Sequence, residues 1–248
     1  MANVETLVID CLDKPTRDIN NLIRQAADDG VPAVEILNTR ARHNIGVGIL
    51  KPIHLIYRGH VGYYTVGLCD GVTAEIHGSS GWGVGDNLLA GEVVVEGNAA
   101  SSAAPSIRGG SIVVKGNAGP RAGIYLKSGD LTVGGDAGYM SGFMMQNGRM
   151  IVCGNAAKGL GDSMYQGQIW LGGKAEEMGS GVTELDVAEF IGRRYTEEGL
   201  EGGDGMIVAV NEHASDPHFE PTPQACSAIK SGDWVLIDLW ARLPEEDA

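Results

Sequence analysis

Short apolar runs, each ending in glycine, recur at a constant interval through the middle of the chain. Their final glycines lie 19 residues apart, at Gly59, Gly78, Gly97, Gly116, Gly135, Gly154 and Gly173. Two further rows of residues keep this interval. One comprises Gly91, Gly110, Gly129, Gly148 and Gly167. The other comprises Gly85, Gly123, Gly142 and Gly161, with Ala104 at the position between Gly85 and Gly123 where the interval predicts a glycine. Three rows in phase indicate a structural repeat.

Each repeat reads as a strand of three to five residues, a turn of glycine with Asn or Asp, and a stretch of small residues. A unit of 19 residues has no room for a crossover helix of ten or more residues, so successive units must stack and pair their strands in parallel, about 4.8 Å apart. We therefore expect an all-β fold. It is a right-handed parallel β-helix of 19-residue coils over residues 46–179, with an N-terminal α/β cap and a short α/β tail. The right-handed form is favoured because the left-handed hexapeptide form needs a period that is a multiple of six.

The N-terminal piece, residues 1–45, has a different pattern. Its apolar positions follow helical spacing at Ile19, Leu22, Ile23 and Ala26. Thr16 is the expected N-cap of this helix and Gly30 the expected stop. Because the open end of a stack of coils presents unpaired strand edges, we expect this piece to cap the stack.

Turn chemistry gives the repeated small residues a structural interpretation. Gly116 and Gly135 are expected to need positive φ at the corners, and the corner Asn is expected to bond its own backbone and the Asn of the next coil. The cluster Gly81-Trp-Gly83-Val-Gly85 resembles a phosphate loop, but it has no following Lys-Ser/Thr and opens no predicted helix. It is therefore interpreted as coil turning.

Charge narrows the function classes. The chain of 248 residues has 18 Lys and Arg against 32 Asp and Glu, a net charge of -14, which argues against binding nucleic acid or an anionic membrane. Residues 181–248 hold 15 acidic and 4 basic residues, net -11, so residues 1–180, with 17 and 14, carry only -3. There is no predicted signal peptide or membrane span, and a cytoplasmic location is expected.

Candidate reactive side chains form no motif typical of a catalytic or metal site. The cysteines Cys11, Cys69, Cys153 and Cys226 include no CxxC pair and are expected to be isolated buried thiols. Nor do His43, His54, His60 and His77 form a ligand spacing, and His60 and His77 are expected to point differently. Asp162-Ser163 lacks a nucleophile elbow. The sequence thus predicts no catalytic, cofactor-binding or metal-binding residue and no cofactor.

The repeat resembles the GXGXG family over roughly residues 5–179. The resemblance rests on Gly59-His-Val-Gly-Tyr-Tyr64, Val94-Val-Glu-Gly97-Asn-Ala99, Ala137-Gly-Tyr-Met-Ser-Gly142, Cys153-Gly-Asn-Ala156 and Gly161-Asp-Ser-Met-Tyr165. This family includes the C-terminal β-helix domain of the glutamate synthase large subunit, stand-alone relatives in N-methylglutamate synthase, and one of the subunits of formylmethanofuran dehydrogenase. The lead-in Val34-Glu-Ile-Leu-Asn38 with Arg42-His43 resembles the stand-alone relatives.

The tail, residues 180–248, resembles creatinase/aminopeptidase P-like metallopeptidases in Val208-Ala-Val-Asn211, Asp216-Pro-His218 and Gly232-Asp-Trp-Val-Leu-Ile-Asp238. The resemblance would align His218 with a substrate-side histidine and Asp238 with the first metal-ligand aspartate. A two-metal site cannot be built from one carboxylate. We therefore expect a peptidase fragment without metal-dependent activity, whose strands lack their usual partners.

The GXGXG resemblance implies a non-catalytic scaffold or docking subunit of a glutamate-synthase-like complex of the N-methylglutamate synthase type. The implied partners are a glutamine-amidotransferase subunit and an FMN/iron-sulfur subunit, and self-association into a homo-oligomer is compatible with the pattern. The alternative is the corresponding GXGXG component of a formylmethanofuran dehydrogenase or formyltransferase/hydrolase complex in one-carbon metabolism.

Overall fold

The computed structural model describes residues 6–176, 183–197, 199–202, 207–216, 218–229, 234–238 and 241–242. The chain forms two compact units, residues 1–179 and 180–248, and each is described by itself. In the ranges just given, no helix is long and apolar enough to cross a membrane.

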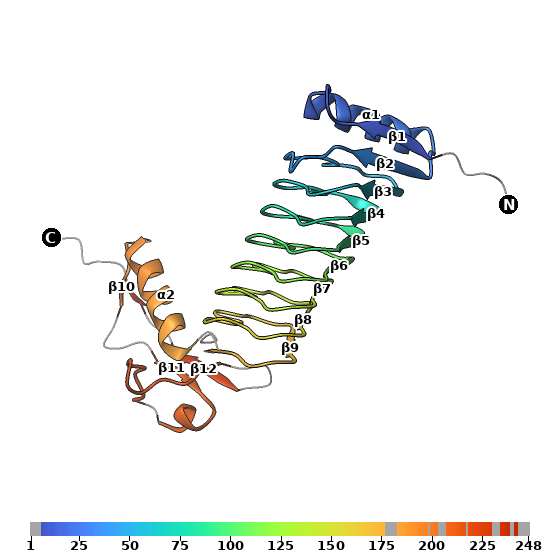
Figure 1. Cartoon of the computed structure of the whole chain (residues 1–248). Coiled ribbons are helices and arrows are strands. Elements are labelled where there is room, and N and C mark those ends of the chain that lie inside the picture. The colour runs from blue at the N-terminus through green and yellow to red at the C-terminus, as the bar shows by residue number, and fades with distance from the viewer. Residues whose placement is uncertain are drawn as a thin grey trace. The chain divides into compact units, whose positions relative to one another are not determined.

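The first unit is a β-solenoid with one strand per coil (Figure 1). Nine parallel strands follow one another in chain order: β1 Leu7–Asp10, β2 Ala33–Leu37, β3 Ile53–Tyr57, β4 Asp70–Ile76, β5 Ala90–Val95, β6 Ser111–Val114, β7 Asp130–Val133, β8 Arg149–Val152 and β9 Gln168–Leu171. From β3 to β9 the pairing keeps the 19-residue register apart from a shift at the start of β4, so that Val93 lies beside Ile112 and Ile112 beside Leu131. The cap strands pair at other intervals, with Leu7 beside Val34 and Ala33 beside His54. The predicted stacking of parallel coils is confirmed. The right-handed winding stays a prediction, since this register is the same for either hand.

Alternate residues of each strand point into the solenoid. Two inward rows are fully buried: Leu55, Ala74, Val93, Ile112, Leu131 and Met150, and Tyr57, Ile76, Val95, Val114, Val133 and Val152. Residues between them face outward, as in β6, where Ser111 and Val113 are partly exposed. Burying these two rows excludes water from the coil interior and is the main stabilisation of the stack.

A second line of contacts joins the coils beyond the strand corner. Single-residue parallel bridges link Ala99 to Ala118, Ala118 to Ala137 and Ala137 to Ala156, and these alanines are buried. The same line begins with Val61 and Ser80, which are also buried, and continues with alanine in the later coils. The recurring Asn-Ala and Asp-Ala pairs of the sequence therefore mark a corner with a polar outer residue and a small inner one.

The third side of each coil contains alternate residues with left-handed φ. In one coil these are Gly83, Gly85 and Asn87, with φ of 67°, 70° and 52°. Gly85 also lies where an added Cβ would strike the Cδ1 atom of Ile112. The Gly81-Trp-Gly83-Val-Gly85 cluster is thus a coil segment that opens no helix, as predicted.

Glycine at the strand-end corners has a different cause from the one predicted. Gly116 and Gly135 do not have left-handed φ. Instead, a Cβ at Gly116 would strike Oδ1 of Asn98, and a Cβ at Gly135 would strike Oδ1 of Asn117. The expectation of positive φ at these corners was wrong, and close approach between coils explains the glycines.

The cap adds both strands and a helix to one end of the solenoid. Helix α1, Thr16–Asp28, lies between β1 and β2, and its buried residues include Ile19, Ile23 and Ala26. Thr16 is the first helical residue and the N-cap is Pro15, which gives no side-chain cap, whereas Gly30 ends the helix with φ of 74° as expected.

Contacts of α1 with the first coil show how the cap is held. Leu22 is 40% exposed and lies off the buried stripe. The buried Asn20 replaces it: its Nδ2 donates to the carbonyl of Asn44 at 2.7 Å, and its Oδ1 accepts the N–H of Gly46 at 2.7 Å. A polar residue on the inner face therefore fixes the helix to the backbone of the adjoining coil.

The second unit has a small α/β arrangement. It contains α2 Glu184–Glu197, β10 Glu201–Gly202, β11 Ile207–Val210, the 3-10 helix η1 Asn211–Ser215, β12 Val235–Asp238 and β13 Ala241–Arg242. Strands β11 and β12 pair antiparallel, as do β10 and β13. The tail strands thus pair with each other, and the absence of the partners of a full peptidase domain stays a prediction. The apolar run from Trp234 to Trp240 predicts a strand; β12 forms within it, and residues 239–240 lie outside the described residues.

Candidate functional site

Polar side chains at the strand-end corner form a ladder along the solenoid. In each coil a side-chain acceptor takes the backbone N–H of the equivalent residue one coil further. The acceptor–donor pairs are His60 Nδ1 and Ser79 (2.9 Å), Ser79 Oγ and Asn98 (3.1 Å), Asn98 Oδ1 and Asn117 (2.8 Å), Asn117 Oδ1 and Asp136 (2.8 Å), Asp136 Oδ1 and Asn155 (2.7 Å), and Asn155 Oδ1 and Lys174 (3.0 Å). Each side chain accepts a backbone N–H from the corner of the next coil rather than one from its own corner. The predicted bonds between successive corners are therefore present, and their donor is a backbone N–H. The members of this ladder hold the coils together.

The histidines are divided among separate structural roles. His60 belongs to the ladder, whereas His77 Nε2 lies 3.3 Å from Glu75 Oε2 on the outer face of the sheet. His54 Nε2 lies 3.0 Å from the other oxygen of Glu75. As expected, His60 and His77 point to different partners. In the part of the chain that the structure describes, no three His, Cys, Asp or Glu residues are placed to hold a metal ion.

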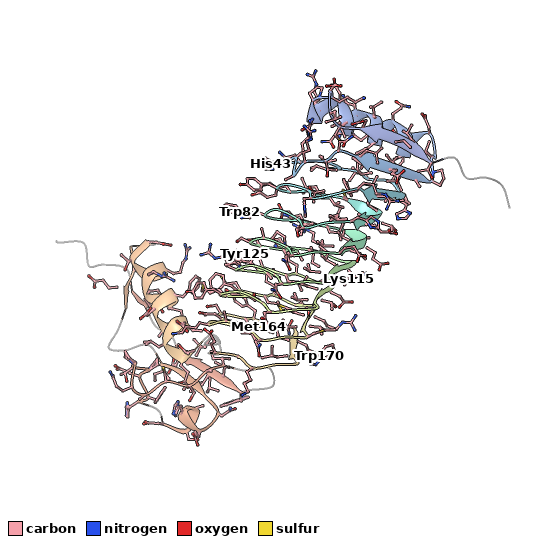
Figure 2. All side chains as sticks on the ribbon, viewed as in Figure 1. His43, Trp82, Lys115, Tyr125, Met164 and Trp170 are labelled. Carbon is pink, nitrogen blue, oxygen red and sulfur yellow. The ribbon has the colours of Figure 1, made fainter. Side chains whose placement is uncertain are left out.

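An exposed stack of three rings lies on the side of the solenoid that has left-handed φ. The ring of His43 stacks on Tyr63 with centroids 4.0 Å apart, and Tyr63 stacks on Trp82 at 5.3 Å. His43 Nδ1 accepts the N–H of Tyr63 at 3.0 Å, which fixes the imidazole in the stack. Trp82 is 57% exposed. Figure 2 shows His43 and Trp82 on one edge of the solenoid.

Sequence reasoning missed this stack, although its signal is present. Tyr63 and Trp82 are 19 residues apart and so occupy one position of the repeat, whereas His43 precedes Tyr63 by 20 residues and departs from that period by one. Large exposed aromatic residues on a folded scaffold are typical of a surface that binds another molecule. The stack is thus a candidate interaction surface.

The candidate Asp162-Ser163 pair is bonded within itself. Ser163 donates its hydroxyl to the carboxylate of the adjacent Asp162 at 2.9 Å.

The four cysteines differ in exposure. Cys11 and Cys69 are buried as expected, and burial raises the pKa of Cys69 to about 11. Cys153 is exposed and Cys226 partly exposed, so the expectation of buried thiols was wrong for these two. Cys153 follows β8 at the outward side of the strand end, where the alternation of the strand turns its side chain away from the core.

In the second unit the predicted peptidase residues lie on the surface. His218 is exposed, and its backbone N–H donates to Asp216 Oδ1 at 2.9 Å. Asp238 is exposed at the end of β12, paired with Ile207 of β11. His218 is thus bonded to the side chain of Asp216 and Asp238 to the backbone of β11, and neither occupies the polar centre of this unit.

That polar centre is Glu184, which is fully buried at the start of α2. Its carboxylate accepts the N–H groups of Val210 (2.5 Å) and Ser227 (2.6 Å), and both oxygens lie 3.0 Å from His213 Nδ1. A carboxylate that bonds three segments in this way joins α2 to β11, to η1 and to the segment of Ser227. Sequence reasoning missed it, because a Glu at a helix start is also common on surfaces.

Comparisons with known proteins match parts of the chain. The model of metallopeptidase family M24 matches residues 170–245, less than a third of the chain, which agrees with the resemblance of the tail. Protein GlxC of Rhizobium meliloti (strain 1021) is 40% identical over 91 residues, covering 36% of this chain and 39% of GlxC. The match thus spans about two fifths of that relative. No solved structure is significantly similar to the chain.

Proposed function

We propose that this protein is a non-catalytic scaffold or docking subunit of a glutamate-synthase-like complex of the N-methylglutamate synthase type. Its partners would be a glutamine-amidotransferase subunit and an FMN/iron-sulfur subunit, which would carry the chemistry. The observation that best supports this proposal is that the repeated motif residues have a structural role in the solenoid. The corner acceptors from His60 to Asn155 bond the backbone of the next coil, so the motif stacks coils.

The physical properties of the solenoid suit this role. Parallel strands in constant register form one continuous ladder, and every coil is buried against its neighbours. Such a stack resists bending and holds bound proteins at a fixed separation, as transfer of ammonia between two active sites requires. The exposed rings of Tyr63 and Trp82 offer a contact for a partner.

Co-purification from the native host tests the proposal. The full-length chain carrying an affinity tag is expected to retain a glutamine-amidotransferase subunit and an FMN/iron-sulfur subunit in defined proportion. Flavin absorbance of the purified complex provides a second readout. Recovery of formylmethanofuran-type partners would support the one-carbon alternative instead, and recovery of the chain alone would contradict both.

A matched variant locates the contact. Trp82→Ala removes the exposed end of the stack, and Trp170→Ala removes a ring of similar exposure on β9 (Figure 2). If the stack binds a partner, Trp82→Ala should weaken retention of that partner at least tenfold while Trp170→Ala changes it little. Equal retention in both variants would exclude the stack from the interface.

A further inference from the structure

The side of the solenoid that has left-handed φ continues beyond Trp82 as one surface over three coils. Residues 101–108, 120–127 and 139–146 occupy the same place in these coils, 19 residues apart. The N–H of Ser102 donates to the carbonyl of Pro120 at 2.8 Å, and that of Arg121 to Tyr139 at 2.8 Å, so the segments lie directly beside one another. We call these three segments the basic–aromatic face.

All charged residues of this face are basic. It contains Arg108, Arg121 and Lys127 and no Asp or Glu, in a chain whose net charge is -14. Arg108 and Arg121 are exposed and Lys127 is partly exposed. None of the three forms an ion pair with a residue that the structure describes.

The sheet face of the same coils is different. There Lys115 Nζ lies 2.7 Å from Glu96 Oε1, and Arg149 Nη2 lies 2.6 Å from Asp130 Oδ2. Cations on the sheet face are thus neutralised by the neighbouring coil, whereas those on the basic–aromatic face are left for another molecule. Figure 2 shows Tyr125 and Lys115 on opposite edges of the solenoid.

Exposed rings and flexible apolar side chains lie among these cations. Tyr125 is 37% exposed and Tyr139 is 51% exposed. Phe143 meets Tyr125 edge-on with centroids 6.3 Å apart. Met140 and Met144, from the same coil as Phe143, are partly exposed. Tyr, Phe, Met and Arg are the residue types enriched at the centres of protein interfaces, and Met adapts its shape to a partner.

We propose that the basic–aromatic face binds an acidic segment of a partner protein, one that combines carboxylates with apolar side chains. The carboxylates would pair with Arg108, Arg121 and Lys127, and the apolar side chains would cover Tyr125 and Tyr139. Three cations spread among rings and thioethers match such a segment better than a phosphate backbone, which needs denser positive charge. This inference rests on the proposed docking function and adds the chemistry of the contact.

A synthetic probe tests the charge and ring complementarity directly. The full-length chain is titrated into a fluorescent copolymer of glutamate and tyrosine, and separately into a single-stranded oligothymidylate. We expect the copolymer to bind more tightly. The triple variant Arg108→Gln, Arg121→Gln, Lys127→Gln should weaken its binding at least tenfold. The matched control Arg58→Gln, Lys115→Gln, Arg149→Gln removes three cations that are each paired with a carboxylate, Arg58 with Glu35, and should weaken binding less than threefold.

Several outcomes would overturn the proposal. They are absence of copolymer binding, equal loss in both triple variants, or tighter binding of the oligothymidylate. Self-association of the wild-type chain that the face variant abolishes would assign the face to a second copy instead. Far-UV circular dichroism confirms that each variant is folded, and Tyr125→Ser with Tyr139→Ser tests the rings without changing charge.

Co-purification separates this inference from the proposed function. If the wild-type chain retains its partners and the face triple variant retains them equally, the proposed role of the basic–aromatic face is contradicted while the docking function stands. If the wild-type chain retains no partner, the docking function fails, and copolymer binding still decides whether the face recognises acidic segments.

Discussion

Oδ1 of Asn98 accepts the backbone N–H of Asn117, one coil further along the solenoid, at 2.8 Å. The bond replaces a contact that strand pairing cannot supply, because the chain turns at this corner and its N–H leaves the sheet ladder. Repetition of the bond from His60 to Lys174 gives the solenoid a second column of hydrogen bonds parallel to the strands.

Loss of one ladder acceptor should lower the free energy of unfolding by a small but measurable amount. Asn98→Ala removes the partner of the Asn117 N–H, and a net hydrogen bond of this kind contributes about 1 kcal/mol. Asn98→Asp keeps an acceptor oxygen and should retain stability. Thermal unfolding followed by circular dichroism measures both, and equal melting temperatures for the two variants would contradict a stabilising role of the side-chain oxygen.

Two glycines with similar φ should respond differently to a methyl group. Gly85 and Gly48 have φ of 70° and 67°, but a Cβ at Gly85 would strike Ile112 whereas a Cβ at Gly48 meets nothing within 4 Å. Gly48→Ala should therefore lower the free energy of unfolding only by the cost of left-handed φ, about 1 kcal/mol. Gly85→Ala should lose about 2–3 kcal/mol, since overpacking adds to that cost. Denaturant unfolding measures the difference, and equal losses would exclude the clash.

The buried Cys69 thiol should give the first unit a pH dependence in alkali. Burial raises its pKa from 9.0 to about 11, so unfolding releases a proton between these pH values. The free energy of unfolding should therefore fall as the pH rises from 9 to 11, with Cys69 contributing about 1.4 kcal/mol per pH unit. Cys69→Ala should reduce this slope, and an unchanged slope in that variant would contradict the assignment. Denaturant titrations at several pH values measure the slopes.

Thiol reactivity gives an independent check of the same assignment. At pH 8 we expect iodoacetamide to modify Cys153 first and to leave Cys69 unmodified, because the reagent needs an accessible thiolate. Peptide mass spectrometry identifies the modified positions. Early modification of Cys69 would show that its segment opens readily.

Glu184 should be the residue on which the second unit depends most. Glu184→Ala leaves the N–H groups of Val210 and Ser227 without their acceptor, and loss of a buried charged partner typically costs about 3 kcal/mol. Hydrogen exchange at residues 207–210 should then accelerate strongly. The exposed Glu189→Ala, on the same helix, serves as the control. Unchanged protection in Glu184→Ala would mean that the carboxylate is not the link between these segments.

The tail should show no metal-dependent peptidase activity despite its similarity to family M24. Asp238 lies exposed on an antiparallel pair, and one carboxylate cannot hold two metal ions. We expect no hydrolysis of an Xaa-Pro peptide with added Mn²⁺ or Co²⁺. Hydrolysis that requires either ion and disappears in Asp238→Ala would overturn this interpretation.

Sequence reasoning reached the solenoid because its signal is periodic. Residues such as Val93, Ile112 and Leu131 repeat at a fixed interval, and stacking is the only way to bury them together. The cause of individual glycines was harder to predict. Gly85 combines left-handed φ with a close contact, whereas Gly116 has only the contact, and a sequence shows neither backbone angles nor distances between coils.

The surfaces were predicted less well than the core. The stack of His43, Tyr63 and Trp82 depends on side-chain rotation, and the central place of Glu184 depends on segments up to 43 residues away. Such features follow from tertiary packing, which local patterns do not encode. The position of a residue within the 19-residue coil was nevertheless enough to group the rings of Tyr63 and Trp82 once the coil was known.

The constant register also means that the length of the solenoid can change only in whole steps. Deleting residues 99–117 would join Asn98 to Ala118 and reproduce the Asn-Ala corner, with each donor and acceptor meeting an equivalent partner. Everything beyond the deletion would move about 4.8 Å toward the cap. Gain or loss of a coil is therefore a discrete adjustment of reach, available to evolution and to engineering without redesign of the core.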